Sequence, residues 1–450
     1  MPGPRCARPI LLVAALTLVA MACSGGGAAK APVAVTPTTE ALPPGSEPIS
    51  LAVIVPDYTT LIPTGDVPHV TPVFAVDRWR AEAAALDDAG TDNPWSARFQ
   101  TITWDPTAGT DAVCAAIGAS SAALFVSAAR LPTAVHDCLD ADDRAALTLT
   151  PGRGERTFSV LPATGRFARA AAARALDLGI GDGPVVVVVG DDVTGEAAAR
   201  GLTGALHDAG RETTTVTVPS TLGVEAVRRA VPTLLDSIRS ASPGTVLYAA
   251  NTTIAGELGD GLVTGPWRTV GIDVDGLTDH WASGRLPPAW LGTSAITALA
   301  PTTIAESRFE AECRASFEAF VAGTASRSPR ADWVVSVGRG VASTRGAIDG
   351  SASPPPDIGY HECTLMRTLG SALATVEPPF TTGELVAALR TSGAQPVARA
   401  RQGDFGTDTG LVHHTLVVEL TRPDDLPCAA ARQRCWTTSS GDRSGLVSFG

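Results

Sequence analysis

The sequence predicts an α/β protein of two lobes, each built around a parallel sheet. One observation is the run of five valines from Val185 to Val189, which lies between the turn residues Gly183-Pro184 and Gly190. An unbroken β-branched run of this length suits a strand that is buried on both faces, as strands of parallel sheets are. The other observation is that strand patterns alternate with helical patterns both before and after this run.

The valine run begins a βαβ unit. An Ala-rich helical pattern covers residues 196–207 and ends at Gly210, a residue type that commonly follows a helix C-terminus. Residues 213–218 then return to a β-branched strand pattern. Units of this kind are right-handed and place small-molecule sites at the carboxyl ends of their strands, which here means residues 190–195.

The remaining elements support the same architecture. Before the valine run we expect strands at 51–55, 99–104, 122–126 and 147–150 and helices at 74–88, 111–117, 131–139 and 165–178. After it we expect strands at 245–250, 269–272 and 415–420 and helices at 224–240, 254–262, 304–321, 360–374 and 381–389, the last with Thr382 as its N-cap. Elements at this spacing indicate parallel sheets with helices on both faces.

The composition excludes several classes of protein. Of the 450 residues, 44% are hydrophobic and 18% are charged, which is typical of a globular chain. The formal charge of −12 argues against a nucleic-acid partner, because phosphate binding requires a basic face. Lys30 is the only lysine, so the chain lacks the lysine that a P-loop, a Schiff-base enzyme or a protein kinase requires.

The N-terminus has the pattern of an export signal. A positively charged start precedes an apolar segment at 9–21, which is too short to span a bilayer and ends in small residues. Cys23 and a flexible run of serine and glycine come next, so the region resembles the lipobox of bacterial lipoproteins. We therefore expect a signal peptide at 1–22 and lipidation of Cys23 with diacylglycerol and palmitate. Residues 23–48 would be a tether on the outer face of the bacterial cell membrane.

The other cysteines predict disulfides. Of the eight cysteines, Cys6 lies in the signal and Cys23 is the lipidation site, which leaves six in the exported chain. Six cysteines allow 15 pairings, so the sequence alone leaves the pairing open. Proximity along the chain favours Cys114–Cys138, Cys313–Cys363 and Cys428–Cys435. Since no cysteine or histidine cluster has the spacing of a zinc site, we expect disulfides, no metal and no cofactor.

Two acidic loops leave an enzymatic alternative open. Asp191-Asp192 follows the valine strand, and such acids either bind Mg²⁺ or cap the next helix. The segment 273–276, Asp-Val-Asp-Gly, is similar to the nucleophile loop of haloacid dehalogenase-type phosphatases, although the chain lacks the lysine which that family usually adds. We expect no catalytic site. An extracytoplasmic hydrolase acting at Asp273 or Asp191 is the alternative from a different class of protein.

Several segments together are similar to a known family. They are the first strand from Leu51 to Pro56, the segment Phe158 to Pro162 before a long helix, the turn from Val185 to Gly195, the helices at 360–374 and 381–389, and Gly403 to Gly406. Their order resembles that of the type 1 periplasmic binding proteins, in particular the leucine/isoleucine/valine-binding solute receptors of ABC transporters. The resemblance covers about residues 49–425.

The resemblance implies two Rossmann-like lobes with parallel sheets, joined by three crossovers and closing on a small ligand. The first lobe would contain about residues 49–160 and 290–350, and the second about 161–289 and 351–425. Residues 426–450 would form a tail pinned by the last two cysteines.

The resemblance also implies where the ligand binds. In that family, hydroxyl and N–H groups of the first lobe bind a ligand carboxylate, and an acid of the second lobe binds the ammonium group. The ligand-binding positions implied here are Tyr58, Ser127, Ala128, Thr148, Thr150, Val193, Asn251 and Asp273. Val193 stands where many members carry an aromatic residue, which leaves open whether the ligand is an α-amino acid.

We therefore expect an extracytoplasmic, lipid-anchored solute-binding protein. It would deliver a small polar ligand, an amino acid or a related metabolite, to an ABC permease. A ligand sensor on the same fold, which signals to a membrane partner, is the alternative that lies nearest to this expectation.

Overall fold

The computed structural model describes most of the chain beyond residue 46. The described residues are 36–37, 47–56, 78–83, 95–104, 109–179, 183–278, 286–301, 304, 306–325, 360–377, 379–406, 409–422, 424–425, 428, 434–438 and 445–449. All of them belong to one compact unit, Val33–Gly450. The predicted signal peptide, Cys23 and Tyr58 lie outside the described residues.

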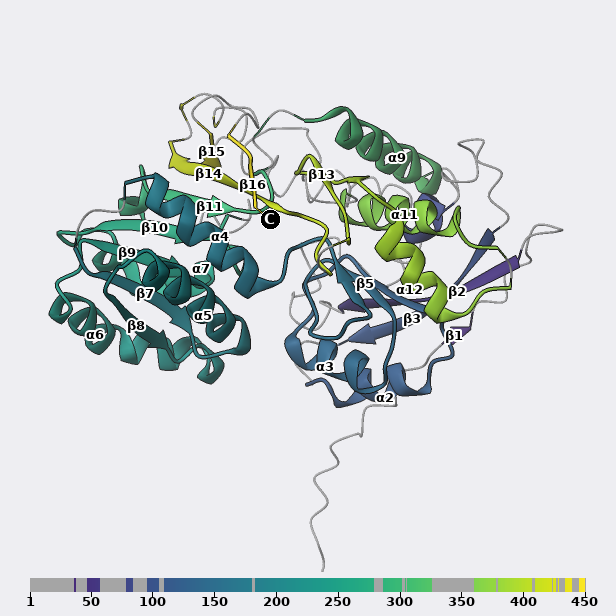
Figure 1. The fold of residues 1–450 in the computed structure, drawn as a ribbon, viewed down its shortest axis with the longest axis horizontal. Helices are drawn as coiled ribbons and strands as arrows, with labels where there is room; N and C mark the ends of the chain where they lie inside the picture. The colour runs from purple at the N-terminus through teal and green to yellow at the C-terminus, as the bar shows by residue number, and fades with distance from the viewer. Residues whose placement is uncertain are drawn as a thin grey trace, which may run out of the picture. The chain divides into compact units, whose positions relative to one another are not determined.

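Two sheets organise these residues (Figure 1). The first contains, in spatial order, β1 (Thr36–Pro37), β3 (Trp95–Trp104), β2 (Glu47–Pro56), β4 (Leu124–Ser127), β5 (Ala146–Thr148) and β6 (Thr157–Ser159). Its strands are parallel except β1, which is antiparallel to β3. The helices α2 (Asp111–Ala119) and α3 (Thr133–Ala141) connect strands of this sheet.

The second sheet contains, in spatial order, β15 (Cys435–Thr437), β14 (His414–Thr421), β11 (Ser294–Thr297), β10 (Arg268–Ile272), β9 (Thr245–Ala249), β7 (Val185–Gly190) and β8 (Thr213–Val218). The strands β7 to β11 are parallel, and β14 is antiparallel to β11, β15 and β16 (Val447–Ser448). Its helices are α4 (Thr164–Asp177), α5 (Val193–Asp208), α6 (Val224–Ser240) and α7 (Thr252–Leu258), with 3₁₀ turns η2 (Ser220–Leu222), η3 (Gly259–Leu262) and η4 (Pro288–Trp290). The predicted α/β architecture with parallel sheets is confirmed.

The valine run explains why β7 lies inside the second sheet. All its residues are buried, and it pairs with β8 on one side and β9 on the other. Val185, Val187 and Val189 belong to one hydrophobic cluster together with residues of α4 and α5. Val186 and Val188 belong to another, which contains residues of α6 and α7. Because successive side chains of a strand point to opposite faces, the valines supply both cores.

Among the described elements the chain crosses between the two sheets three times. We call each sheet with its helices the first or the second lobe. The chain passes to the second lobe between β6 and α4, returns after β11 and passes over again before β14. The returning helices are α9 (Arg308–Ala325), α11 (Tyr360–Leu373) and α12 (Thr382–Thr391). They belong to the first lobe, because Ser316 Oγ donates to Glu82 Oε1 at 2.9 Å and Arg390 Nη2 donates to the carbonyl of Glu155 at 2.7 Å.

These passages lie later in the chain than the expected boundaries at about 290 and 351. The first differs because β11 pairs with β10 in the second sheet, and the second because α11 packs against α9. The crossovers also bind one another. Ser159 N donates to the carbonyl of Thr409 at 2.7 Å, and Ala300 N donates to that of Arg399 at 2.6 Å. A short antiparallel pair, β12 (Gln395–Pro396) and β13 (Gln402–Gly403), lies before the last crossover.

Disulfides link Cys114 to Cys138, Cys313 to Cys363 and Cys428 to Cys435. The pairing that proximity favours is therefore confirmed. The first disulfide joins α2 to α3, the second joins α9 to α11, and the third holds the tail where β15 extends the second sheet.

Two further details concern the helices. The N-cap of α12 is Thr381 and not Thr382, because Thr381 Oγ1 accepts from Glu384 N at 3.2 Å while Thr381 N donates to the Glu384 carboxylate at 2.6 Å. This reciprocal arrangement is a capping box. Among the helices that the structure describes, none is both long enough and apolar enough to cross a membrane.

Candidate functional site

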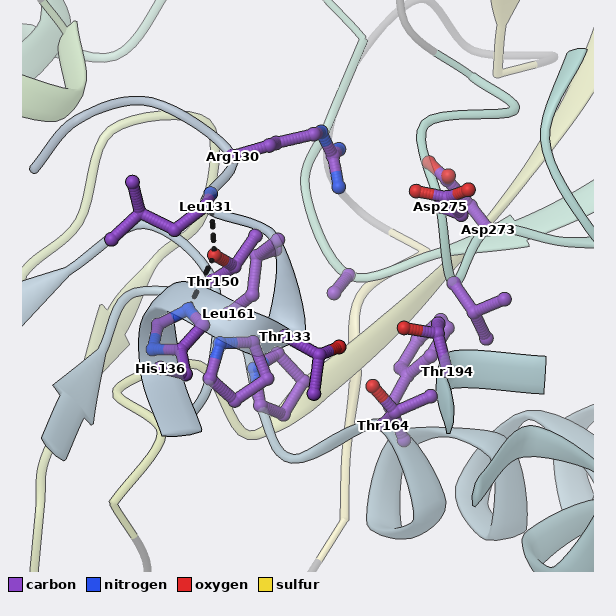
Figure 2. Close-up of a pocket in the computed structure, with 15 residues that line it drawn as sticks. Arg130, Leu131, Thr133, His136, Thr150, Leu161, Thr164, Thr194, Asp273 and Asp275 are labelled. Carbon is purple, nitrogen blue, oxygen red and sulfur yellow. Dashed lines mark hydrogen bonds between the residues drawn. The ribbon is translucent and has the colours of Figure 1, made fainter. Parts of the chain in front are cut away.

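A pocket of about 100 Å³ lies where strands of both sheets end (Figure 2). Its residues come from the loops that follow β4, β5, β6, β10 and β11 and from the first turns of α3, α4 and α5. They are Arg130, Leu131, Thr133, His136, Thr150, Pro151, Leu161, Pro162, Thr164, Phe167, Thr194, Asp273, Val274, Asp275 and Ala298. Loops at the carboxyl ends of parallel strands are the usual place for a small-molecule site in α/β proteins.

The first-lobe wall of the pocket carries a cation and a hydroxyl. Arg130 lies between β4 and α3, and its side chain projects across the pocket towards Asp275 (Figure 2). Thr150 follows β5, and its Oγ1 accepts a hydrogen bond from Leu131 N at 3.2 Å. The same oxygen lies 3.1 Å from His136 Nε2. Arg130 and Thr150 can therefore both face a ligand.

His136 stands on α3 behind Thr150 and is 2% exposed. Burial lowers its pKa from 6.5 to about 4, although the carboxylates of Asp140 and Asp137 act in the opposite direction. The imidazole is therefore neutral at pH 7, and Arg130 supplies the positive charge of this wall.

Asp273 lies on the second-lobe wall, but its own loop already occupies its carboxylate. Leu277 N donates to Oδ1 at 2.8 Å, and the hydroxyl of Thr297 contacts Oδ2 at 3.0 Å. The hydroxyl of Thr278 also donates to Oδ2. These bonds close the turn after β10, so the main role of Asp273 in the structure is to hold the loop.

Asp275 is the acid of the second lobe that the loop leaves available. Among the described residues, Asn251 Nδ2 is its one side-chain donor, at 3.3 Å. Burial raises the pKa of Asp275, while Arg130 and Asn251 oppose this effect. The raised pKa means that this carboxylate lacks full compensation for its burial, which a cationic ligand group would supply.

Hydroxyls and apolar groups complete the pocket. Thr164 is the first residue of α4 and Thr194 the second of α5, and both line the pocket near Val274. The position of α5 depends on Gly195, since a Cβ there would lie 2.1 Å from the carbonyl oxygen of Gly190. Only glycine therefore lets the helix start so close to the end of β7.

The structure brings two of the predicted ligand-binding residues, Thr150 and Asp273, to the pocket wall. Three first-lobe positions serve the fold instead. Ser127 Oγ donates to the carbonyl of Ile54 at 2.8 Å, and Thr148 Oγ1 donates to that of Thr150 at 2.7 Å, both from fully buried positions. Ala128 packs against the core.

Val193 and Asn251 do not line the pocket either. Val193 begins α5, and its neighbour Thr194 is the residue that reaches the wall. Asn251 is the N-cap of α7, where its Oδ1 accepts from Ile254 N at 3.0 Å, and it contacts the pocket only through Asp275. The binding roles of these residues stay predictions.

Sequence reasoning missed Arg130, His136, Thr164 and Thr194, and it weighed Asp275 only as part of a phosphatase-like motif. Most of them share one signal, which is their position directly after a parallel strand or at the start of the next helix. Asp273 and Asp275 both follow the same strand, so this signal does not distinguish between them. Their hydrogen bonds do, because the loop occupies Asp273 and leaves Asp275 available.

Asp191 and Asp192 support the capping alternative. Asp192 is the N-cap of α5 and accepts from Gly195 N at 2.7 Å. Asp191 accepts from Thr221 N and Thr221 Oγ1, each at 2.7 Å. In the part of the chain that the structure describes, no group of three or more His, Cys, Asp or Glu residues is placed to hold a metal ion.

No protein-family model and no curated protein sequence matches the chain. Solved structures do. A fatty acid ABC transporter substrate-binding protein from Thermomonospora curvata has a TM-score of 0.56 at 12% identity, over 90% of this chain and 94% of that one. A solute-binding protein of an R. palustris ABC transporter, in complex with 4-hydroxybenzoate, has a TM-score of 0.58 at 9% identity, over 89% and 97%.

A leucine-, isoleucine-, valine-, threonine- and alanine-binding protein from Brucella ovis, in a closed conformation, has a TM-score of 0.55 at 14% identity, over 87% and 95%. These similarities cover nearly the whole of each chain and agree with the α/β architecture with parallel sheets described above. The chain has the fold of the type 1 periplasmic binding proteins of ABC transporters.

Proposed function

We propose that the chain is an extracytoplasmic solute-binding protein that captures a small ligand bearing both an anionic and a cationic group. An amino acid or a related metabolite fits this description, and an ABC permease would receive it. The observation that carries the proposal is that Arg130 and Asp275 line one pocket from opposite lobes. A ligand carboxylate beside Arg130 and an ammonium group beside Asp275 would each meet a side chain of opposite charge.

The ligands named for the structural neighbours support the anionic half of this proposal. Fatty acids, 4-hydroxybenzoate and amino acids share a carboxylate, although their other groups differ widely. Arg130 is the one cation among the pocket-lining residues of the described chain at neutral pH, because His136 is neutral there. We therefore infer that Arg130 binds the carboxylate of the ligand. The other residues of the pocket would determine which carboxylic acid is selected.

The proposed location rests on the N-terminal pattern and on the disulfides. A signal peptide at 1–22 and lipidation of Cys23 would place the protein on the outer face of the membrane, where disulfides persist. Globomycin treatment and mass spectrometry of the N-terminal peptide test this proposal. A diacylglyceryl group on Cys23 supports it, and an unmodified Cys23 contradicts it.

A thermal-shift screen tests the ligand. Amino acids, carboxylic acids without an amine, amines without a carboxylate, and neutral amides would each be added to the purified protein. A ligand that binds only the folded state stabilises it by about 2.7 kcal/mol at 100 times its Kd. We expect compounds with both charged groups to raise the melting temperature most. Absence of any shift across these classes would contradict the proposed function.

A further inference from the structure

We propose that His136 makes Thr150 a hydrogen-bond donor to the ligand, so that this part of the pocket accepts a group with a free lone pair and rejects a donor. The inference rests on the proposed function, because it assigns the polarity of one contact in the same pocket. It concerns a positioning residue, since His136 acts on the ligand through Thr150.

The hydrogen-bonding capacity of a hydroxyl sets the first step. A threonine hydroxyl has one donor and two acceptor positions. Leu131 N, which is always a donor, uses one acceptor position of Thr150 Oγ1 at 3.2 Å. His136 Nε2, at 3.1 Å, uses either the second acceptor position or the hydrogen, depending on which ring nitrogen carries the proton. The tautomer of His136 therefore decides what Thr150 offers to the pocket.

The surroundings of Nδ1 decide the tautomer. Within the described residues, the buried Nδ1 of His136 has no hydrogen-bond partner. A proton on Nδ1 would leave a buried N–H group without an acceptor, and buried N–H groups are satisfied more strictly than acceptors are. A proton on Nε2 is instead donated to Thr150 Oγ1. The Nε2–H tautomer is therefore favoured, and with burial keeping the ring neutral at pH 7 it is the main form.

This tautomer leaves Thr150 with one free function. Both acceptor positions of Oγ1 are filled by Leu131 N and His136 Nε2, so the O–H hydrogen is what the hydroxyl presents to the pocket. Arg130 lines the same wall and is likewise a donor only. Two donors and one positive charge select a carboxylate over an ammonium or amide N–H group. The opposite tautomer would turn Thr150 into an acceptor and remove this selection.

The test is nuclear magnetic resonance of the purified protein with ¹⁵N-labelled histidine. Long-range ¹H–¹⁵N correlations distinguish the two neutral tautomers and the charged ring. The chain has seven histidines, so His136→Gln identifies the signals of His136 by their loss. If that variant does not fold, Thr150→Ser identifies them by a shift, because serine keeps the hydroxyl.

We expect His136 to be the neutral Nε2–H tautomer at pH 7 and to remain neutral until the pH approaches about 4. The Nδ1–H tautomer, or a charged ring at pH 7, overturns the inference. The ligand screen fails or succeeds independently of this result. An Nε2–H tautomer with no ligand in any class would confirm the hydrogen bond from His136 to Thr150 and contradict the proposed function instead.

Discussion

Two acidic loops follow strands of the second sheet, and they differ in how their carboxylates are satisfied. In the loop after β7, Asp191 accepts from Thr221 N and Thr221 Oγ1, each at 2.7 Å, and lies 2.9 Å from Ser220 Oγ. In the loop after β10, Asp275 accepts one bond from Asn251 Nδ2, at 3.3 Å. Both loops carry two acids at the carboxyl end of a parallel strand.

The pKa values of the two acids shift in opposite directions. Burial acts to raise the pKa of Asp191, but the hydrogen bonds from Thr221 and Ser220 outweigh it, so the pKa is lowered. Burial raises the pKa of Asp275, and Arg130 with Asn251 only partly opposes it. The comparison teaches that the donors within reach, and not the acidic motif, separate an acid that holds a turn from one that can receive a ligand.

The largest effect is expected from Asp273→Ala, within the loop after β10. The change leaves Leu277 N and the buried hydroxyl of Thr278 without their main acceptor, whereas the hydroxyl of Thr297 can still donate to the carbonyl of Leu299 at 2.9 Å. At about 1 kcal/mol for each of these two bonds, the free energy of unfolding should fall by roughly 2 kcal/mol. Urea unfolding measures this, with Asp275→Ala as the matched control two residues away. Equal losses in the two variants would remove the distinction between these acids.

A smaller effect is expected from Asp191→Asn, which weakens the bonds to Thr221 and Ser220. The residue is partly exposed, so we expect a loss of about 1 kcal/mol at pH 7. A lowered pKa in the folded state gives stability that is present above the unfolded value of 3.8. It is lost as the pH falls through the folded value, so wild type and variant should converge in acid. A difference that persists there would contradict this account.

The smallest effect on the free energy of unfolding is expected from Asp275→Asn in the ligand-free protein. Unlike the other two changes, this one should stabilise the protein relative to wild type as the pH rises. Because its folded pKa is raised, wild type loses stability as the pH rises from about 3.8 through the folded value. The variant has no such loss, so its relative stability should increase with pH. Urea unfolding at several pH values measures the difference. A variant that becomes relatively less stable with rising pH would show that Asp275 is well compensated after all.

Much of the fold could be predicted from the sequence. The valine strand, the Ala-rich helix after it and the strand at 213–218 have strong local patterns, and the structure shows all three. The strand β11 was missed because Ser294–Thr297 is short and its hydrophobic pattern is weak. The expected lobe boundary at about residue 290 therefore lies too early in the chain. The pairing of β11 with β10 is a long-range contact that no local pattern reveals.

The site was harder to predict than the fold. The family resemblance implied Thr150 and Asp273 as ligand-binding positions, and both line the pocket, while their binding roles stay predictions. It could not show that Thr278 and Thr297 would occupy Asp273, because their distance in space depends on the sheet. Arg130 was not predicted as a site residue, because an arginine in a loop is usually solvated. Only the structure places it opposite Asp275.

The most direct measurement is isothermal titration calorimetry of an amino acid that stabilises the protein in the thermal-shift screen, with Asp275→Asn and Asp191→Asn as a matched pair. Both variants remove one negative charge from a loop at the same edge of the second sheet. Truncating one partner of a buried charge pair costs about 2 kcal/mol or more in binding. We predict that Asp275→Asn weakens binding about 30-fold or more, while Asp191→Asn binds like wild type. Equal affinities for the two variants would contradict the assignment of Asp275 to the ligand.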